Sequence, residues 1–420
     1  MTSQTIQILF VDLALILLLA RGFGVLATRL GQPPVIGEIF TGILLGPTLF
    51  DGQLAEALFP SAVRPLLTGM ADVGVALFMF IIGLELERGV LRGMGRSTVV
   101  VAAGSTLLTF ALGVGLGFYL LLGHPSDDAA AFVVFLGLSV SVTAFPVLAR
   151  IIADRGLGRT TVGAFALATA ATIDVVAWVA LAAIQAFTGG DGQQHWPVLL
   201  LLPYVAVMFL VVRPLLRRWL ATGGSAGTVR VSRLAAILSG ALLSGAATEA
   251  MGMHFIFGAF LFGLVMPTED AERHNDAVAK QTAQLTTVLL PIYFVVAGLK
   301  VDLGGLGLGG LLDFGAILLV ALLGKLGGTY LAARTQGLPP RASAALGALM
   351  NTRGLTELII LGVGLRIGLL DDSLYSLMVV MALVTTAMTG PLLVWIYRRP
   401  VEVAAPAVSP ELVSTGRPST

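Results

Sequence analysis

The stretch SVTAFPVLAR, residues 141–150, interrupts an apolar segment with a proline. Pro146 has no backbone N–H and disfavours helical geometry at Phe145, so we expect a helix through this region to break there. A second apolar segment carries MNTRGLTELI, residues 350–359, in which Gly354 can act as the break. Membranes tolerate interrupted helices only where the freed backbone groups face a cavity or other protein. The two stretches therefore predict a pair of broken helices inside a membrane protein.

The composition is that of a chain embedded in a lipid bilayer. The 420 residues are 56% hydrophobic and only 12% charged, about half the charge of a typical soluble domain. Apolar runs of roughly 20 residues, the length that crosses a bilayer as a helix, recur along the sequence. The chain has no cysteine, four scattered histidines and a net charge of +1. We therefore expect no cofactor, no resident metal and no nucleic-acid partner.

About thirteen apolar segments are expected to cross the bilayer, which makes the fold class an all-α polytopic membrane protein. They lie at about 5–28, 32–49, 65–86, 97–122, 129–153, 161–188, 196–219, 231–250, 252–266, 282–300, 311–335, 341–365 and 374–397. With the N-terminus outside and the C-terminus cytoplasmic, most of the 25 Lys and Arg residues fall in cytoplasmic segments, as the positive-inside rule requires. Residues 1–400 then form one transmembrane domain, and residues 401–420 a disordered cytoplasmic tail.

An odd number of segments allows two six-helix halves of opposite orientation around a linker helix at 196–219. Inverted halves are a common plan of transporters. The segments that carry Pro146 and Gly354 each occupy the fifth place of their half. We therefore expect two inverted repeats whose broken helices cross, with helix ends and bare carbonyls facing each other as in known ion sites.

Several ionisable residues lie where the sequence is otherwise suited to hydrocarbon. Asp174, in TAATIDVVAW (169–178), and Lys325 are the deepest, and Arg353 and Glu357 flank the second break. A charge at the bilayer centre costs about 2.5–3.5 kcal/mol on insertion scales, so such residues mark function. The alternative is a buried Asp174–Lys325 ion pair that only fixes helix packing. Arg353 and Glu357 either pair, four residues apart, or neutralise the dipoles of the broken helix.

Asp174 is expected to bind a proton and a monovalent cation, Na⁺ or K⁺, in alternation. Burial favours the protonated carboxyl, whereas the ionised carboxylate is a hard oxygen ligand for a small dehydrated cation. Thr143 and the carbonyls freed around Phe145 and Pro146 would complete the ligand shell. Lys325 would compensate the charge of the empty carboxylate. If only the neutralised or cation-loaded site crosses between the two faces, the protein exchanges cations for protons.

Eight segments, taken in order, resemble the monovalent cation:proton antiporter-2 family, on the branch of the plant cation/H⁺ exchangers and their bacterial relatives. They are GQPPVIGEIFTGILLGPTLF (31–50), FMFIIGLELE (78–87), TAFPVLARIIAD (143–154), IDVVAW (173–178), MGMHFIFGAFLFGLVMP (251–267), LPIYFVVAGLKVDL (290–303), GKLGGTYLAAR (324–334) and MNTRGLTELIILGVG (350–364). The resemblance implies a thirteen-helix sodium/proton-antiporter fold, a homodimer, and an elevator in which a core domain moves against a dimerisation domain. The core helices are then expected at about 65–188 and 282–397, and the dimerisation helices at about 5–49 and 196–266.

The resemblance also implies roles for individual residues. The family's core aspartate corresponds to Asp174, its core lysine to Lys325, and the threonine and proline of its first broken helix to Thr143 and Pro146. The second broken helix matches Thr352, Arg353 and Gly354. We expect a bacterial inner membrane, because the termini are short and no cytosolic domain is visible in the sequence.

Ile173 departs from the pattern of the family. Many relatives have Asp, Asn or Gln just before the core aspartate, and a second carboxylate there accompanies electrogenic exchange. Ile173 therefore favours one-for-one, electroneutral exchange, and it leaves the choice of cation open. Thr172 is a candidate to replace the missing ligand.

Antiport has three alternatives. A cation channel lacks support because no stretch resembles a TVGYG selectivity filter, and a buried Asp–Lys pair would obstruct a pore. A membrane enzyme is disfavoured because no nucleophile and base are grouped in the sequence. A same-fold transporter of an organic solute stays open because fold does not fix substrate, although Asp174 favours cations.

Overall fold

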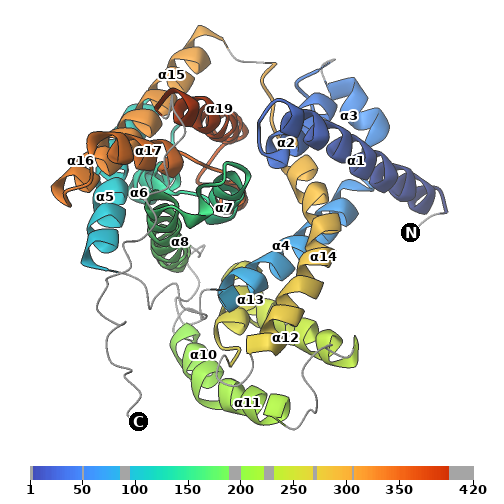
Figure 1. The fold of residues 1–420 in the computed structure, drawn as a ribbon. Helices are drawn as coiled ribbons and strands as arrows, with labels where there is room; N and C mark the ends of the chain where they lie inside the picture. The colour runs from blue at the N-terminus through green and yellow to red at the C-terminus, as the bar shows by residue number, and fades with distance from the viewer. Residues whose placement is uncertain are drawn as a thin grey trace, which may run out of the picture.

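The computed structural model describes residues 3–49, 52–85, 95–188, 200–221, 231–267, 272–304 and 307–396, and all regular elements within these ranges are helices (Figure 1). The α-helices are α1 (Ser3–Arg29), α2 (Pro34–Leu45), α3 (Gln53–Leu58), α4 (Arg64–Glu85), α5 (Arg96–Leu120), α6 (Ala129–Ser141), α7 (Phe145–Asp154), α8 (Thr161–Thr188), α10 (Leu201–Val207), α11 (Arg213–Ala221), α12 (Val231–Ala250), α13 (Phe255–Leu264), α14 (Glu272–Gly298), α15 (Leu308–Leu322), α16 (Gly328–Thr335), α17 (Pro340–Met350), α18 (Leu355–Arg366) and α19 (Asp372–Ile396). The predicted all-α fold class is confirmed.

Each of the thirteen predicted segments overlaps a helix or a pair of consecutive helices. Within the described residues, eight helical segments are long and apolar enough to cross a membrane, counting Ala129–Asp154 (α6 and α7) and Leu308–Thr335 (α15 and α16) as one each, or up to nine if the bent pair α17 and α18 forms one span. The chain is thus a multi-pass membrane protein, while the count of thirteen crossings and the inverted repeats stay predictions. The predicted tail, 401–420, lies outside the described residues.

Local sequence explains where several helices begin. Pro34 and Pro340 occupy the first turns of α2 and α17, where the missing proline N–H has no helical partner to lose. Asp128 caps α6, because its side chain accepts a hydrogen bond from the backbone N–H of Ala131 at 2.9 Å. Lys325 lies in a short π-helix, η6 (Leu323–Gly327), between α15 and α16.

The helices pack as two groups (Figure 1). The scaffold group contains α1, α2, α4, α12, α13 and α14, and it forms the right and lower parts of the view. The crossing group contains α5, α6, α7, α8, α15, α16, α17, α18 and α19, and its labelled helices lie on the left. The packing therefore differs from the expected division, which assigned 65–86 and 282–300 to the core: the helices of these segments, α4 and α14, pack with the scaffold group.

Close backbone contacts explain why α4 and α14 join the scaffold group. A Cβ atom at Gly83 of α4 would lie 2.1 Å from the carbonyl oxygen of Phe260 in α13. A Cβ atom at Gly298 of α14 would lie 2.4 Å from the carbonyl oxygen of Ile39 in α2. Small residues at helix crossings allow this approach in membranes. Which group moves and which forms a dimer stays a prediction.

Candidate functional site

Two helix interruptions contact each other inside the crossing group. The backbone is non-helical at 142–144, between α6 and α7, and at 351–354, between α17 and α18, where the helix axis bends by 43°. The backbone N–H of Ala144 donates to the carbonyl of Thr352 at 3.1 Å. The hydroxyl of Thr143 donates to the carbonyl of Met350 at 2.9 Å. The two breaks therefore satisfy part of each other's freed backbone, as an interrupted membrane helix requires.

The first break lies slightly earlier than the sequence predicted. Phe145 and Pro146 were expected to be the interruption, but both belong to the first turn of α7. Proline suits that position because an N–H in the first turn has no partner within the helix. The extended residues that precede it, Val142 to Ala144, form the interruption instead.

The second break depends on the small size of Gly354. A Cβ atom at this position would lie only 2.5 Å from Cγ2 of Val147 in α7. Its backbone is extended, with φ of 164°, so the need for glycine comes from space and not from backbone strain. Gly354 therefore lets the start of α18 approach the first turn of α7.

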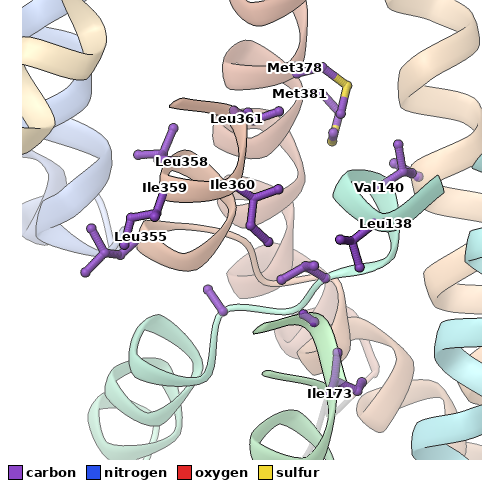
Figure 2. Packing of buried hydrophobic residues seen from close by; sticks show 14 of the residues in the cluster. Leu138, Val140, Ile173, Leu355, Leu358, Ile359, Ile360, Leu361, Met378 and Met381 are labelled. Atoms are coloured by element: carbon purple, nitrogen blue, oxygen red, sulfur yellow. The ribbon is translucent and has the colours of Figure 1, made fainter. Parts of the chain in front are cut away.

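Apolar side chains surround the two breaks. Figure 2 shows Leu138 and Val140 near the end of α6, Ile173 on α8, and Leu355, Leu358, Ile359, Ile360 and Leu361 along α18. These labelled residues are among the buried hydrophobic residues of one continuous cluster. We call the place where the two breaks contact each other the crossing. The low polarity strengthens every electrostatic interaction there.

Asp174 on α8 lies beside the first break and is only 5% exposed. Its Oδ2 accepts a hydrogen bond from the backbone N–H of Phe145, the first residue of α7, at 3.3 Å. The positive end of the α7 dipole therefore faces a carboxylate. Its Oδ1 is buried without a hydrogen-bond partner in the described part of the chain. The Thr356 hydroxyl and the Lys325 ammonium also interact with this carboxyl group.

Lys325 is fully buried in η6. Its Nζ has no hydrogen-bond partner among the described residues, and it forms no ion pair with Asp174 within 4.0 Å. It interacts electrostatically with Asp174, Arg353 and Glu357. A π-helical turn of this kind is frequent at functional positions. The geometry therefore argues against the alternative in which Asp174 and Lys325 only form a packing ion pair.

Arg353 and Glu357 fill both roles that the sequence left open. Arg353 Nη1 pairs with Glu357 Oε1 at 2.8 Å, and both side chains are buried. Arg353 Nη1 also donates to the carbonyl of Ser139 at 3.2 Å, and Nη2 donates to the carbonyl of Val140. These carbonyls end α6, so the guanidinium neutralises the negative end of that helix. Glu357 lies in the first turn of α18, where a negative charge is favoured.

The candidate ligand Thr172 lies on α8, two residues before Asp174, and is half-buried. Its hydroxyl donates to the carbonyl of Ala168 at 2.8 Å, one turn earlier in the same helix. Ile173, between them, is 2% exposed and packs in the apolar cluster. Among the predicted residues, the hydroxyl of Thr143 contacts the second break directly, whereas the Thr172 hydroxyl bonds within its own helix.

A set of hydroxyl and amide side chains around the second break was not predicted from the sequence. The Thr386 Oγ1 accepts from the backbone N–H of Arg353 and donates to its carbonyl, both at 2.8 Å. Thr352 Oγ1 donates to Thr389 Oγ1 at 3.4 Å, and Asn351 Nδ2 donates to the carbonyl of Thr385 at 3.1 Å. The segment VTTAMTG (384–390) in an apolar helix was the available signal.

The fold and the crossing define a class: multi-pass helical membrane proteins with two interrupted helices in contact around a buried aspartate. A family model described as "Sodium/hydrogen exchanger, transmembrane" matches residues 14–399. The chain belongs to the sodium/hydrogen exchanger family. The resemblance to cation:proton antiporters found in the sequence is thereby confirmed.

Curated relatives resemble most of the chain. The Na(+)/H(+) antiporter NhaS4 of Synechocystis is 37% identical over 410 residues, which are 95% of this chain and 100% of that protein. Cation/H(+) antiporter 20 of Arabidopsis thaliana is 38% identical over 412 residues, 93% of this chain and 48% of that protein. The K(+)/H(+) antiporter 1 of Saccharomyces cerevisiae is 32% identical over 94% of this chain and 47% of its own length. The chain thus spans about half the length of the plant and yeast relatives.

A solved structure confirms the antiporter fold. The sodium proton antiporter MjNhaP1 from Methanocaldococcus jannaschii superposes with a TM-score of 0.69 at 15% sequence identity, covering 94% of this chain and 97% of its own. At this identity the likeness concerns the fold alone.

Proposed function

We propose that this protein is a secondary active antiporter that exchanges a monovalent cation, Na⁺ or K⁺, for H⁺, and that it performs no enzyme chemistry. The observation that carries the proposal is Asp174, a nearly fully buried carboxylate: one oxygen accepts from the N-terminus of α7, and the other has no hydrogen-bond partner among the described residues. Relatives named as Na(+)/H(+) and K(+)/H(+) antiporters support this cargo.

Competition at one carboxylate produces the exchange. When Asp174 is protonated, its charge is absent and burial costs little. When it is ionised, Oδ1 and neighbouring oxygen atoms bind a dehydrated cation, with the hydroxyls of Thr143 and Thr356 as candidate ligands. An ionised and empty site is the costly state, because an isolated charge is poorly solvated at the crossing. Lys325 offsets that charge, and only the loaded or protonated site moves readily.

Movement of the crossing group against the scaffold group would expose the site to one face and then the other. The division into two packed groups supports an elevator of this kind. Ile173 is apolar, whereas a carboxylate at its position could bind a second transported proton. Its presence therefore favours one-for-one, electroneutral exchange. We further propose a homodimer in a bacterial inner membrane, with the N-terminus outside and the C-terminus cytoplasmic.

Purified protein in liposomes that contain a pH dye tests the proposal. A preformed pH gradient should dissipate when Na⁺ or K⁺ is added, and Asp174→Asn should abolish this response. Asp154→Asn is the matched control, because Asp154 is exposed and pairs with Arg150 at the end of α7. Exchange that survives in Asp174→Asn would refute the assigned site. A large current that follows the cation gradient without proton movement would instead identify a channel.

A further inference from the structure

A cavity of about 440 Å³ lies between the two helix groups, apart from the crossing itself. Asp72 on α4 and Tyr293 on α14 line it from the scaffold group, and Ile359 and Gly362 on α18 line it from the crossing group. A second cavity of about 580 Å³ shares Thr68, Val296, Lys300 and Leu365 with the first. The second cavity is also lined by residues of the loop after α14, such as Asp302, so the space continues to the helix ends.

The cavity follows α18 toward the candidate site. Thr356, whose hydroxyl interacts with Asp174, lies in the first turn of α18. Ile359 comes one turn later and lines the cavity, and Arg366 also lines it, at the end of the helix. Along α18, Ile359 is thus about one helical turn, roughly 5 Å, from Thr356, whereas Arg366 marks the far end of the cavity.

Asp72 is the acidic side chain on the cavity wall that the exchange mechanism leaves without a role. It is half-buried and makes no ion pair within 4.0 Å among the described residues. The charged groups that interact with it are Lys300, Arg366 and Glu249. Arg366 is already paired with Glu249 of α12, and Lys300 also interacts with Asp372. The positive charges near Asp72 are thus partly offset by other carboxylates.

Oxygen atoms near Asp72 complete a set suited to a monovalent cation. Thr68 lies one turn earlier on α4 and lines the same cavity. Its hydroxyl proton is donated to the carbonyl of Arg64 at 2.9 Å, which leaves the oxygen lone pairs free to accept. Tyr293 of α14 lines the same cavity and carries a further hydroxyl oxygen. Carboxylate and hydroxyl oxygens are hard ligands, as such a cation prefers.

We propose that Asp72 is a second cation site, which captures Na⁺ or K⁺ in the cavity before the ion reaches Asp174. This inference rests on the proposed cation exchange for its biological meaning, but the binding itself does not require transport. Asp72 belongs to the scaffold group, so it remains in place while the crossing group moves.

The absence of cysteine from the chain permits a direct test. Gly362 lines the cavity, and a Cβ atom built there meets nothing within 4 Å, so Gly362→Cys places a reporter thiol in open space. The reporter is introduced together with Asp174→Asn, which removes the first cation site. The rate of modification by a small charged methanethiosulfonate is then measured in NaCl, KCl or choline chloride at equal ionic strength.

We expect Na⁺ or K⁺ to slow the modification severalfold relative to choline, and we expect Asp72→Asn to abolish this protection. Asp72→Glu keeps the charge and should retain it. Gly307→Cys, an exposed position with equal space before α15, is the control and should react at the same rate in all three salts. Equal rates in the three salts at Gly362→Cys, or protection that persists in Asp72→Asn, would overturn the inference. Because the reporter chain carries Asp174→Asn, these outcomes are independent of whether Asp174 is the exchange site.

Discussion

The ion pair of Arg353 and Glu357 offers the most direct test of how the crossing is held. Arg353→Met removes hydrogen bonds to the carbonyls of Ser139 and Val140 and leaves the Glu357 carboxylate without its partner. Both charged side chains are at most 1% exposed. Breaking one partner of a buried pair costs about 3–5 kcal/mol, because the remaining charge is neither solvated nor paired.

The second substitution separates the charge effect from the packing effect. Replacing both partners, as in Arg353→Met with Glu357→Met, leaves no isolated charge, so we expect this double variant to be more stable than Arg353→Met alone. Thermal unfolding in detergent, followed by the loss of the monomeric or dimeric elution peak, measures the order of stability. If the double variant were as unstable as the sum of the two single variants, the pair would not be the dominant interaction, and the reasoning would be refuted.

Three further predictions concern the break, the turn before α13 and the charge balance of exchange. Gly354→Ala places a Cβ atom 2.5 Å from Cγ2 of Val147, so the exchange rate should fall at least severalfold. Adding Val147→Ala should restore most of the exchange. If the single variant loses no activity, the close contact is contradicted. His254 lies in the turn between α12 and α13, where burial and the Arg366 guanidinium lower its pKa to about 3. The imidazole is therefore neutral above that pH, and His254→Gln should leave the pH profile of exchange unchanged between pH 5 and 8, where histidine normally titrates; a shifted profile would identify His254 as a pH sensor. The unaltered protein, with Ile173 before Asp174, should give no transport current on a solid-supported membrane, and a robust current would disprove electroneutral exchange.

Hydropathy and helix-breaking residues predicted much of the fold. Each apolar segment overlaps a helix, because the bilayer demands long apolar stretches whose ends are marked by charge. Pro146 correctly indicated an interruption, but it could not fix the residue where the interruption lies. A proline is compatible both with a break and with the first turn of the helix after it.

Packing and hydroxyl contacts were beyond the reach of the sequence. The placement of α4 and α14 depends on contacts such as Gly83 against Phe260, which involve residues far apart in the chain. Thr386 was missed because a threonine in an apolar helix commonly bonds to the carbonyl one turn earlier, as Thr41 does with Gly37 at 2.8 Å. Only the three-dimensional arrangement distinguishes a threonine that bonds within its helix from one that binds a neighbouring backbone.

The hydrogen bonds between the two breaks have a mechanical consequence. Separating the two breaks would leave four polar groups without hydrogen-bond partners in an apolar environment: the Ala144 amide, the Thr352 carbonyl, the Thr143 hydroxyl and the Met350 carbonyl. Each stranded polar group costs about 1–3 kcal/mol. We therefore expect the two breaks to move together when a ligand binds at either of them. A large displacement would then occur at the boundary of the crossing group and not between the two breaks.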